Sequence, residues 1–137
     1  MDRLAECTRL CVDFAHHIDA RRYSALLALF TEDGVLDRMG TVLRGQAEIA
    51  RFLDARDPSV TTRHLCTNIS IDFTSADTAV GACYVLFFQG QGAGPDGIAT
   101  QTGQPAVVQY HDDYQNTPAG WRIKARRIRM AIRPNPA

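Results

Sequence analysis

Two residues of this sequence, Asp19 and His64, have the types that general acid–base chemistry needs. A carboxylate that accepts a hydrogen bond from one imidazole nitrogen fixes the tautomer and raises the basicity of the other nitrogen. Such a pair can take a proton from carbon or oxygen near neutral pH. We therefore predict that Asp19 and His64 lie within hydrogen-bond reach, about 2.6–3.2 Å between heavy atoms.

Asp19 ends a predicted helix over residues 2–19. At about 100° per residue, its side chain projects from the flank of the apolar stripe of this helix, away from the centre of the charged side. A carboxylate buried there needs a partner, because an unpaired buried charge is costly. The alternative is a structural role, in which Asp19 caps the helix or forms an ion pair with Arg21 or Arg22.

His64 lies near the start of a predicted strand over residues 61–73, which is rich in β-branched residues. Simple alternation places His64 on the same face as Cys66 and Asn68. A lone strand histidine is also typical of a hydrogen-bonded structural residue, so its position alone leaves both roles open.

Three further polar side chains are candidates for binding a substrate. Tyr23 and Tyr110 could supply pocket hydroxyls or could equally be core aromatics. Gln89, at the end of an apolar strand, could help a leaving group or an oxyanion. His16, His17 and Asp19 could suggest a metal site, but His16 points to the polar side of the helix, so the set lacks a clear third ligand and we expect neither a metal nor another cofactor.

The elements that must position these residues are helices first and strands afterwards. This order predicts one α+β domain over residues 1–137, with the helices packed on one face of the sheet. The glycine-rich residues 90–103 are predicted to be a hairpin loop, because a strand rather than a helix follows them. Helices are expected over 2–19, 20–30 and 45–56, a turn at 31–34, short strand pieces at 35–37 and 41–43, and long strands at 61–73, 78–89, 107–114 and 121–132.

Both faces of residues 79–88 are apolar. A sheet covered by helices on one face would leave the other face in water, and a second subunit would cover it. We therefore expect a homodimer or a higher homo-oligomer.

The composition excludes several classes of partner. Lys+Arg and Asp+Glu number 15 each, so no net field recruits nucleic acid or an anionic membrane. No apolar run approaches the roughly 20 residues of a membrane span, and the charged N-terminus lacks an apolar signal core. The protein is therefore expected to be cytoplasmic.

Its four cysteines form no CxxC pair and are predicted to be small buried residues.

Several segments, in order along nearly the whole chain, resemble the SnoaL-like branch of the nuclear transport factor 2-like superfamily. They are IDARRYSALLALFTEDG, RGQAEIARFL, TRHLCTNISIDFTSADTAVG and GWRIKARRIRM. The resemblance implies a cone-shaped, cystatin-like fold in which three N-terminal helices and a curved mixed or antiparallel sheet enclose a pocket.

The nearest patterns within that branch are scytalone dehydratase and hexachlorocyclohexane dehydrochlorinase. Both use an Asp–His dyad for elimination without a metal, and the dyad matches Asp19 and His64. The dehydrochlorinase also has a catalytic arginine that matches Arg126, but this chain has Phe14 where that enzyme has a functional lysine. The resemblance therefore supports a reaction type and leaves the substrate open.

Together these features indicate a cofactor-independent lyase or isomerase that acts on a small, mostly apolar and cyclic molecule. His64 would abstract a proton, and Asp19 would orient and stabilise the imidazolium. Arg126, Gln89 or Tyr110 would help the leaving group or oxyanion. Loss of water is the expected outcome, ahead of cyclisation or a double-bond shift. The alternatives are a polyketide cyclase or a non-catalytic binding or assembly subunit, such as the small subunit of ring-hydroxylating dioxygenases. Fold alone does not separate these functions.

Overall fold

The computed structural model describes residues 2–136 and contains three helices and seven strands. The helices are α1 (Arg3–Asp19), α2 (Tyr23–Leu27) and α3 (Gly45–Asp54). The strands are β1 (Phe30–Arg38), β2 (Thr41–Arg44), β3 (Val60–Phe73), β4 (Thr78–Gln91), β5 (Thr100–Gln101), β6 (Ala106–Thr117) and β7 (Gly120–Ile132).

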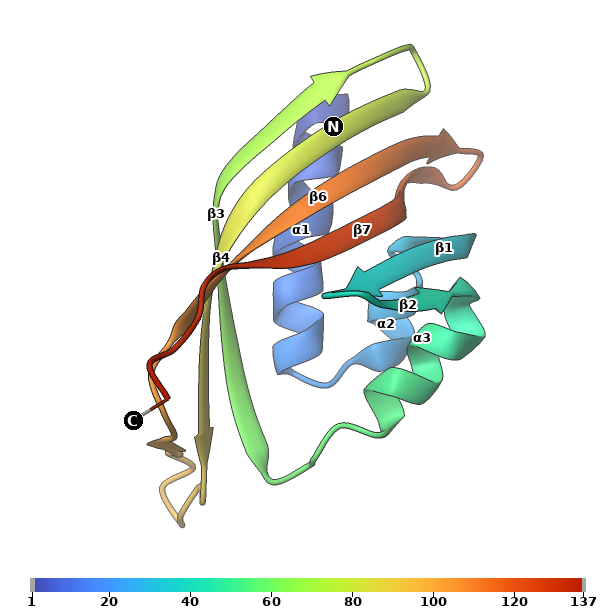
Figure 1. Cartoon of the computed structure of the whole chain (residues 1–137). Helices are drawn as coiled ribbons and strands as arrows, with labels where there is room; N and C mark the ends of the chain where they lie inside the picture. The colour runs from blue at the N-terminus through green and yellow to red at the C-terminus, as the bar shows by residue number, and fades with distance from the viewer. Residues whose placement is uncertain (1, 137) are drawn as a thin grey trace.

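All seven strands form one sheet in the order β2-β1-β7-β6-β4-β3, with β5 added beside β4. β1 and β7 are parallel, and the other pairs are antiparallel. The sheet bends strongly, and the helices lie within its curve (Figure 1). The predicted α+β fold with a curved mixed sheet is therefore confirmed.

Irregular pairing helps to give the sheet its curvature. The β3–β4 register shifts between Thr67 and Ser70, where Asn68 has a positive φ of 53°. The β6–β7 register shifts between Asp113 and Tyr114 and again near Val107. Such bulges bend strands and increase their twist, so the sheet forms a concave inner face.

Helix α1 packs against this concave face. Asp2 caps its N-terminus, because the Asp2 carboxylate accepts a hydrogen bond from the amide of Ala5 at 2.8 Å. Its apolar stripe is buried mainly against β3, with further contacts to β7. The last turn of α1 therefore places Asp19 beside the beginning of β3. The buried stripe consists of Cys7, Leu10, Cys11, Phe14 and Ile18.

The prediction for residues 20–30 was wrong at its C-terminal end. Helix α2 ends at Leu27, and Phe30 already belongs to β1, where it lies opposite Ile123 of β7. Pairing with a strand distant in sequence overrides the local helical pattern here. The predicted turn at 31–34 is part of β1, where an irregularity in the β1–β7 pairing accommodates it.

The remaining boundaries agree with the sequence to within a few residues, apart from β5. This two-residue strand lies inside the predicted loop 90–103, which does join two strands as expected. The described cysteines are all unpaired, and only Cys66 is not fully buried. No helix among residues 2–136 is long and apolar enough to cross a membrane.

Candidate active site

Asp19 and His64 are in contact, as predicted. Asp19 Oδ1 lies 2.6 Å from His64 Nδ1. The backbone N–H of His64 donates to Asp19 Oδ2 at 2.8 Å, and the Thr62 hydroxyl donates to Asp19 Oδ1 at 2.9 Å. The carboxylate therefore holds both the imidazole and the backbone of the strand that carries it. The alternative of an ion pair with Arg21 or Arg22 is not what the structure shows.

The Asp19 carboxylate is held in its ionised form. Burial is the largest single influence and raises its pKa, because it disfavours the charged form. The hydrogen bonds from the side chain and backbone of His64 and from Thr62 outweigh burial, so the pKa of Asp19 lies below its ordinary value. An ionised Asp19 is an acceptor only, and His64 Nδ1 must carry the proton between the two groups.

This tautomer leaves His64 Nε2 with a free lone pair, which is the requirement for a general base. The two ring nitrogens face different directions, so Nε2 points away from Asp19. His64 lines an outer groove between α1 and β3 and two inner cavities. Asp19 lines the outer groove but neither of the inner cavities. We infer that Nε2 is directed to the inner cavities, because Nδ1 faces Asp19 and Asp19 does not line them.

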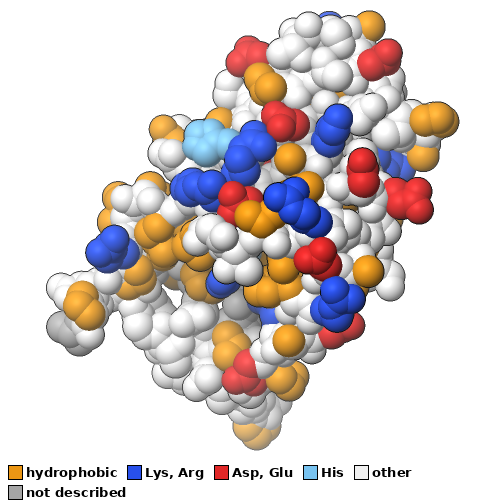
Figure 2. All heavy atoms as spheres, turned by 45° about the vertical axis from the view of Figure 1, so that its right-hand side comes forward, with side chains coloured by type: hydrophobic (Ala, Val, Ile, Leu, Met, Phe, Trp, Pro, Cys, Tyr) orange, Lys and Arg blue, Asp and Glu red, His pale blue; other side chains and the backbone are white. Residues whose placement is uncertain are grey.

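The two inner cavities have volumes of about 230 and 310 Å³. Both are lined by Arg38, His64, Phe87 and Gln89, so they adjoin along one wall. The His64 and Phe87 rings are 4.9 Å apart between centroids. Figure 2 shows the surface hollowed toward the C-terminal end of the chain, with hydrophobic side chains around the hollow and Lys or Arg nearby. The combined space suits a small molecule.

The outer groove is larger, at about 490 Å³, and is lined by Arg22, Arg63 and Cys66 as well as the dyad. Both members of the dyad line this groove, whereas His64 lines the inner cavities without Asp19. We assign the chemistry to the inner cavities because His64 lines them and Asp19, which occupies Nδ1, does not. Side-chain exposures of 11% for His64 and 13% for Asp19 show that water has limited access to the pair.

Two of the predicted substrate-binding residues line the inner cavities. Gln89 lines both of them. Tyr110 lines one, and its hydroxyl has no hydrogen-bond partner among residues 2–136. Burial raises the pKa of Tyr110, so its phenol stays protonated and able to donate.

Tyr23 lies outside both inner cavities. Its hydroxyl accepts hydrogen bonds from Arg56 Nη1 at 2.8 Å and from Arg21 Nη1 at 3.2 Å. Arg56 in turn donates to Thr62 Oγ1 at 3.3 Å, and Thr62 donates to Asp19. Tyr23 therefore supports the dyad through two intermediates, and the structure gives it no direct contact with the cavity.

Arg126 also lies away from the cavity walls. It is fully buried, and its Nε and Nη2 donate to the two oxygens of Asp112 at 2.8 and 2.9 Å. Its guanidinium is 4.5 Å from the ring centroids of both Phe14 and Tyr110. From this position Arg126 reaches a bound molecule only indirectly, by holding the Tyr110 ring in the cavity wall.

Sequence reasoning missed Thr62, Phe87, Arg38 and Arg56. Thr62 could have been found, because it lies two residues before His64 and so shares its face of the strand. Phe87 lies opposite His64 in the β3–β4 pairing, which the sequence pattern does not determine. Among the described residues, no group of three or more His, Cys, Asp or Glu side chains could hold a metal.

Comparison with known proteins places the chain among relatives of the same fold. A protein from Novosphingobium aromaticivorans assigned as a scytalone dehydratase superposes with a TM-score of 0.78 at 23% identity, over 94% of this chain and 84% of that one. A dehydratase assigned to the NTF2-like family from Streptomyces avermitilis gives 0.80 at 15% identity, over 96% and 98%. A protein assigned as an aromatic ring hydroxylase, also from N. aromaticivorans, gives 0.78 at 25% identity, over 98% and 92%.

No curated protein matches the sequence significantly. The SnoaL-like domain, by contrast, matches residues 1–127, and the described structure has the fold of the NTF2-like neighbours. The chain belongs to the SnoaL-like domain family, within the NTF2-like superfamily.

Proposed function

We propose that the protein is a cofactor-independent lyase or isomerase in which His64 is the general base. The observation that carries this proposal is the 2.6 Å contact between Asp19 Oδ1 and His64 Nδ1, on the wall of an inner cavity. An ionised carboxylate behind an imidazole stabilises the imidazolium that forms when Nε2 takes a proton.

The reaction begins with a small molecule between Phe87 and the opposite wall of the cavity. His64 Nε2 removes a proton from carbon, and the electron pair of that C–H bond expels a leaving group from the adjacent carbon. The phenol of Tyr110 or the amide of Gln89 donates a hydrogen bond to the departing group. When that group is hydroxide, it takes the abstracted proton from Nε2 of the His64 imidazolium and leaves as water, so the dyad returns to its starting state and the reaction is a dehydration.

Loss of water is favoured over a double-bond shift or a cyclisation for two reasons. The cavity wall supplies neutral donors, Gln89 and Tyr110, that can hydrogen-bond to a leaving hydroxyl while the His64 imidazolium protonates it. Two of the structures with this fold are also assigned as dehydratases.

A non-catalytic binding or assembly subunit is the second candidate, because the fold alone does not distinguish it from an enzyme. A screen of hydroxylated and halogenated cyclic compounds, followed by NMR, separates the two functions. We expect at least one compound to lose water or a halide, or to exchange a C–H proton, at a rate unchanged by a chelator. A set of compounds that bind the cavity without any reaction would favour the binding subunit.

A further inference from the structure

Arg38 occupies an unusual position in the cavity. It lines both inner cavities together with His64, yet its guanidinium forms no hydrogen bond or ion pair with any residue from 2 to 136. The guanidinium lies over the ring of Phe52, 5.2 Å from the centroid. Arg56, by comparison, is occupied by three protein acceptors. Arg38 is thus a cation at the cavity with its donors unused.

The backbone around Arg38 is fixed although its side chain is exposed. Arg38 ends β1, and Met39 and Gly40 form a two-residue hairpin loop with φ values of 50° and 96°. Two positive φ values are typical of type I′ hairpin turns, but such a value is uncommon for a residue like Met39. Strain of this kind persists only where the surrounding structure enforces it.

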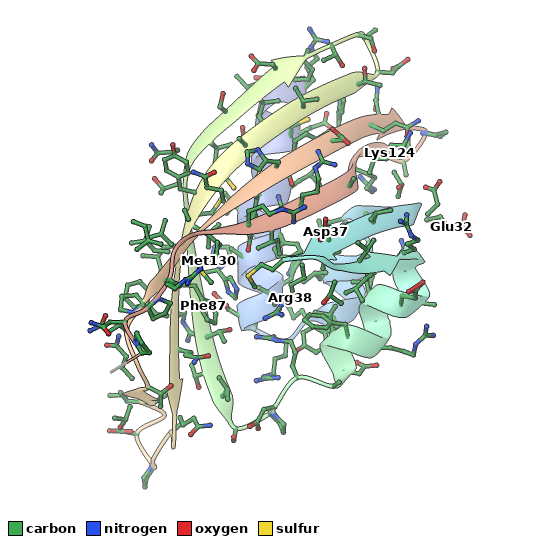
Figure 3. The ribbon with its side chains drawn as sticks, viewed as in Figure 1. Glu32, Asp37, Arg38, Phe87, Lys124 and Met130 are labelled. Atoms are coloured by element: carbon green, nitrogen blue, oxygen red, sulfur yellow. The ribbon has the colours of Figure 1, made fainter. Side chains whose placement is uncertain are left out.

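Three hydrogen bonds hold this hairpin in place. The Met39 amide donates to the Ile128 carbonyl at 3.1 Å. Asp37 accepts from the Gly40 amide at 2.9 Å and from Arg129 at 2.8 Å. Figure 3 shows Asp37, Arg38, Phe87 and Met130 around the bend of the sheet. The hairpin is therefore tied to β7, and it presents Arg38 at the cavity.

The other cavity-lining side chains leave this cation unbalanced. Besides Arg38, the charged side chains among the described residues that line the two inner cavities are Arg56 and Asp57, which carry opposite charges, and Asp57 Oδ1 already accepts two hydrogen bonds from Ser59. The remaining wall is largely apolar, with Phe87, Val108 and Ile128 among its residues. A ligand that complements this cavity has an apolar body and one negative charge.

We infer that the dyad cavity binds an apolar carboxylate and that Arg38 binds its carboxylate group. This inference rests on the proposed function and names its substrate class. The planar fork of an arginine matches a carboxylate, and one free arginine suits a single charge. Arg38 recognises a charge that the substrate already carries. Stabilising a charge that develops during reaction requires donors shielded from water, and Arg38 is exposed.

The test compares naphthalene-2-carboxylate with its neutral analogue naphthalene-2-carboxamide by NMR titration of the protein. We expect the carboxylate to bind about 10-fold more tightly, which is modest because Arg38 is exposed. The amide signals of His64 and Phe87 should shift if the ligand occupies the inner cavity. Arg38→Met keeps an unbranched apolar chain beside Phe52, and it should abolish the preference while leaving the affinity for the carboxamide unchanged.

Arg51→Met is the matched control, because Arg51 is an exposed arginine of α3 outside both cavities. It should leave the preference intact. Equal affinity for both compounds, equal weakening of both by Arg38→Met, or no binding of the carboxylate at millimolar concentration would overturn the inference.

A separate variant distinguishes this inference from the proposed function. His64→Gln should abolish turnover but retain the preference for the carboxylate, because Arg38 is unchanged. A charge preference in a protein that catalyses nothing would refute the general base alone. Catalysis of neutral substrates without any charge preference would refute the role of Arg38 alone.

Discussion

Replacing Asp19 by asparagine should change both the tautomer of His64 and the stability of the protein. Asp19 accepts from His64 Nδ1 at 2.6 Å, from the His64 amide at 2.8 Å and from the Thr62 hydroxyl at 2.9 Å. An asparagine has one oxygen and one NH2 group for these three donors. The new NH2 group must therefore face at least one position that the carboxylate served as an acceptor.

Either orientation of the side-chain amide in Asp19→Asn has a measurable cost. If its NH2 faces His64 Nδ1, the ring must carry its proton on Nε2, and the base is lost, with turnover falling by about 10²–10⁴-fold. If its NH2 faces the His64 backbone N–H instead, two donors oppose each other. The unsatisfied backbone N–H then costs about 1–3 kcal/mol of unfolding free energy.

Two substrate-free measurements check this prediction. Nitrogen-detected NMR of the imidazole identifies which ring nitrogen is protonated, and urea unfolding gives the change in stability. Asp13→Asn is the control, because Asp13 is on the same helix and pairs with the exposed Arg9. It should change stability by less than about 0.5 kcal/mol. A variant Asp19→Asn with both the wild-type tautomer and the wild-type stability would refute the reasoning.

Three further predictions concern stability and assembly. Asp112→Leu should lower the free energy of unfolding in urea by about 3–5 kcal/mol, because it leaves the fully buried Arg126 without its carboxylate. The control Asp113→Asn, at the half-exposed ion pair with Arg127, should lower it by less than about 1 kcal/mol. The pKa of Asp19 is lowered in the folded state, so its contribution to stability is present above the unfolded pKa of about 3.9 and is lost as pH falls through the folded value. In an acid titration monitored by circular dichroism, Asp19→Asn should therefore lose less stability below about pH 4 than the wild type. Light scattering should report a homodimer or a higher homo-oligomer that Tyr84→Lys weakens, because Tyr84 is an exposed hydrophobic residue of the sheet, whereas a wild-type monomer at micromolar concentration would contradict this.

The Asp19–His64 contact could be predicted because it depends on features that are local in sequence. The helical period places Asp19 at the flank of the buried stripe, and alternation along β3 places His64 beside Thr62. The contact further requires that α1 packs on β3, and the family resemblance implied this packing.

Arg38 and the start of β1 could not be predicted in the same way. Both depend on the parallel pairing of β1 with β7, strands that are separated by most of the chain. The same pairing converts the predicted turn at 31–34 into strand and sets where the hairpin meets the cavity. Burial of Arg126 likewise depends on Asp112 lying opposite it in the β6–β7 register. Local periodicity carries no information on such pairings.

Exchange of a substrate C–H proton with solvent deuterium tests the role of His64 most directly. NMR would follow this exchange for a compound found in the screen, in the wild type and in His64→Ala, with ligand affinity measured in parallel. The proposed mechanism predicts that His64→Ala slows exchange by about 10²–10⁴-fold while the fold and the affinity remain largely intact. Exchange at the wild-type rate in a folded His64→Ala protein would contradict it.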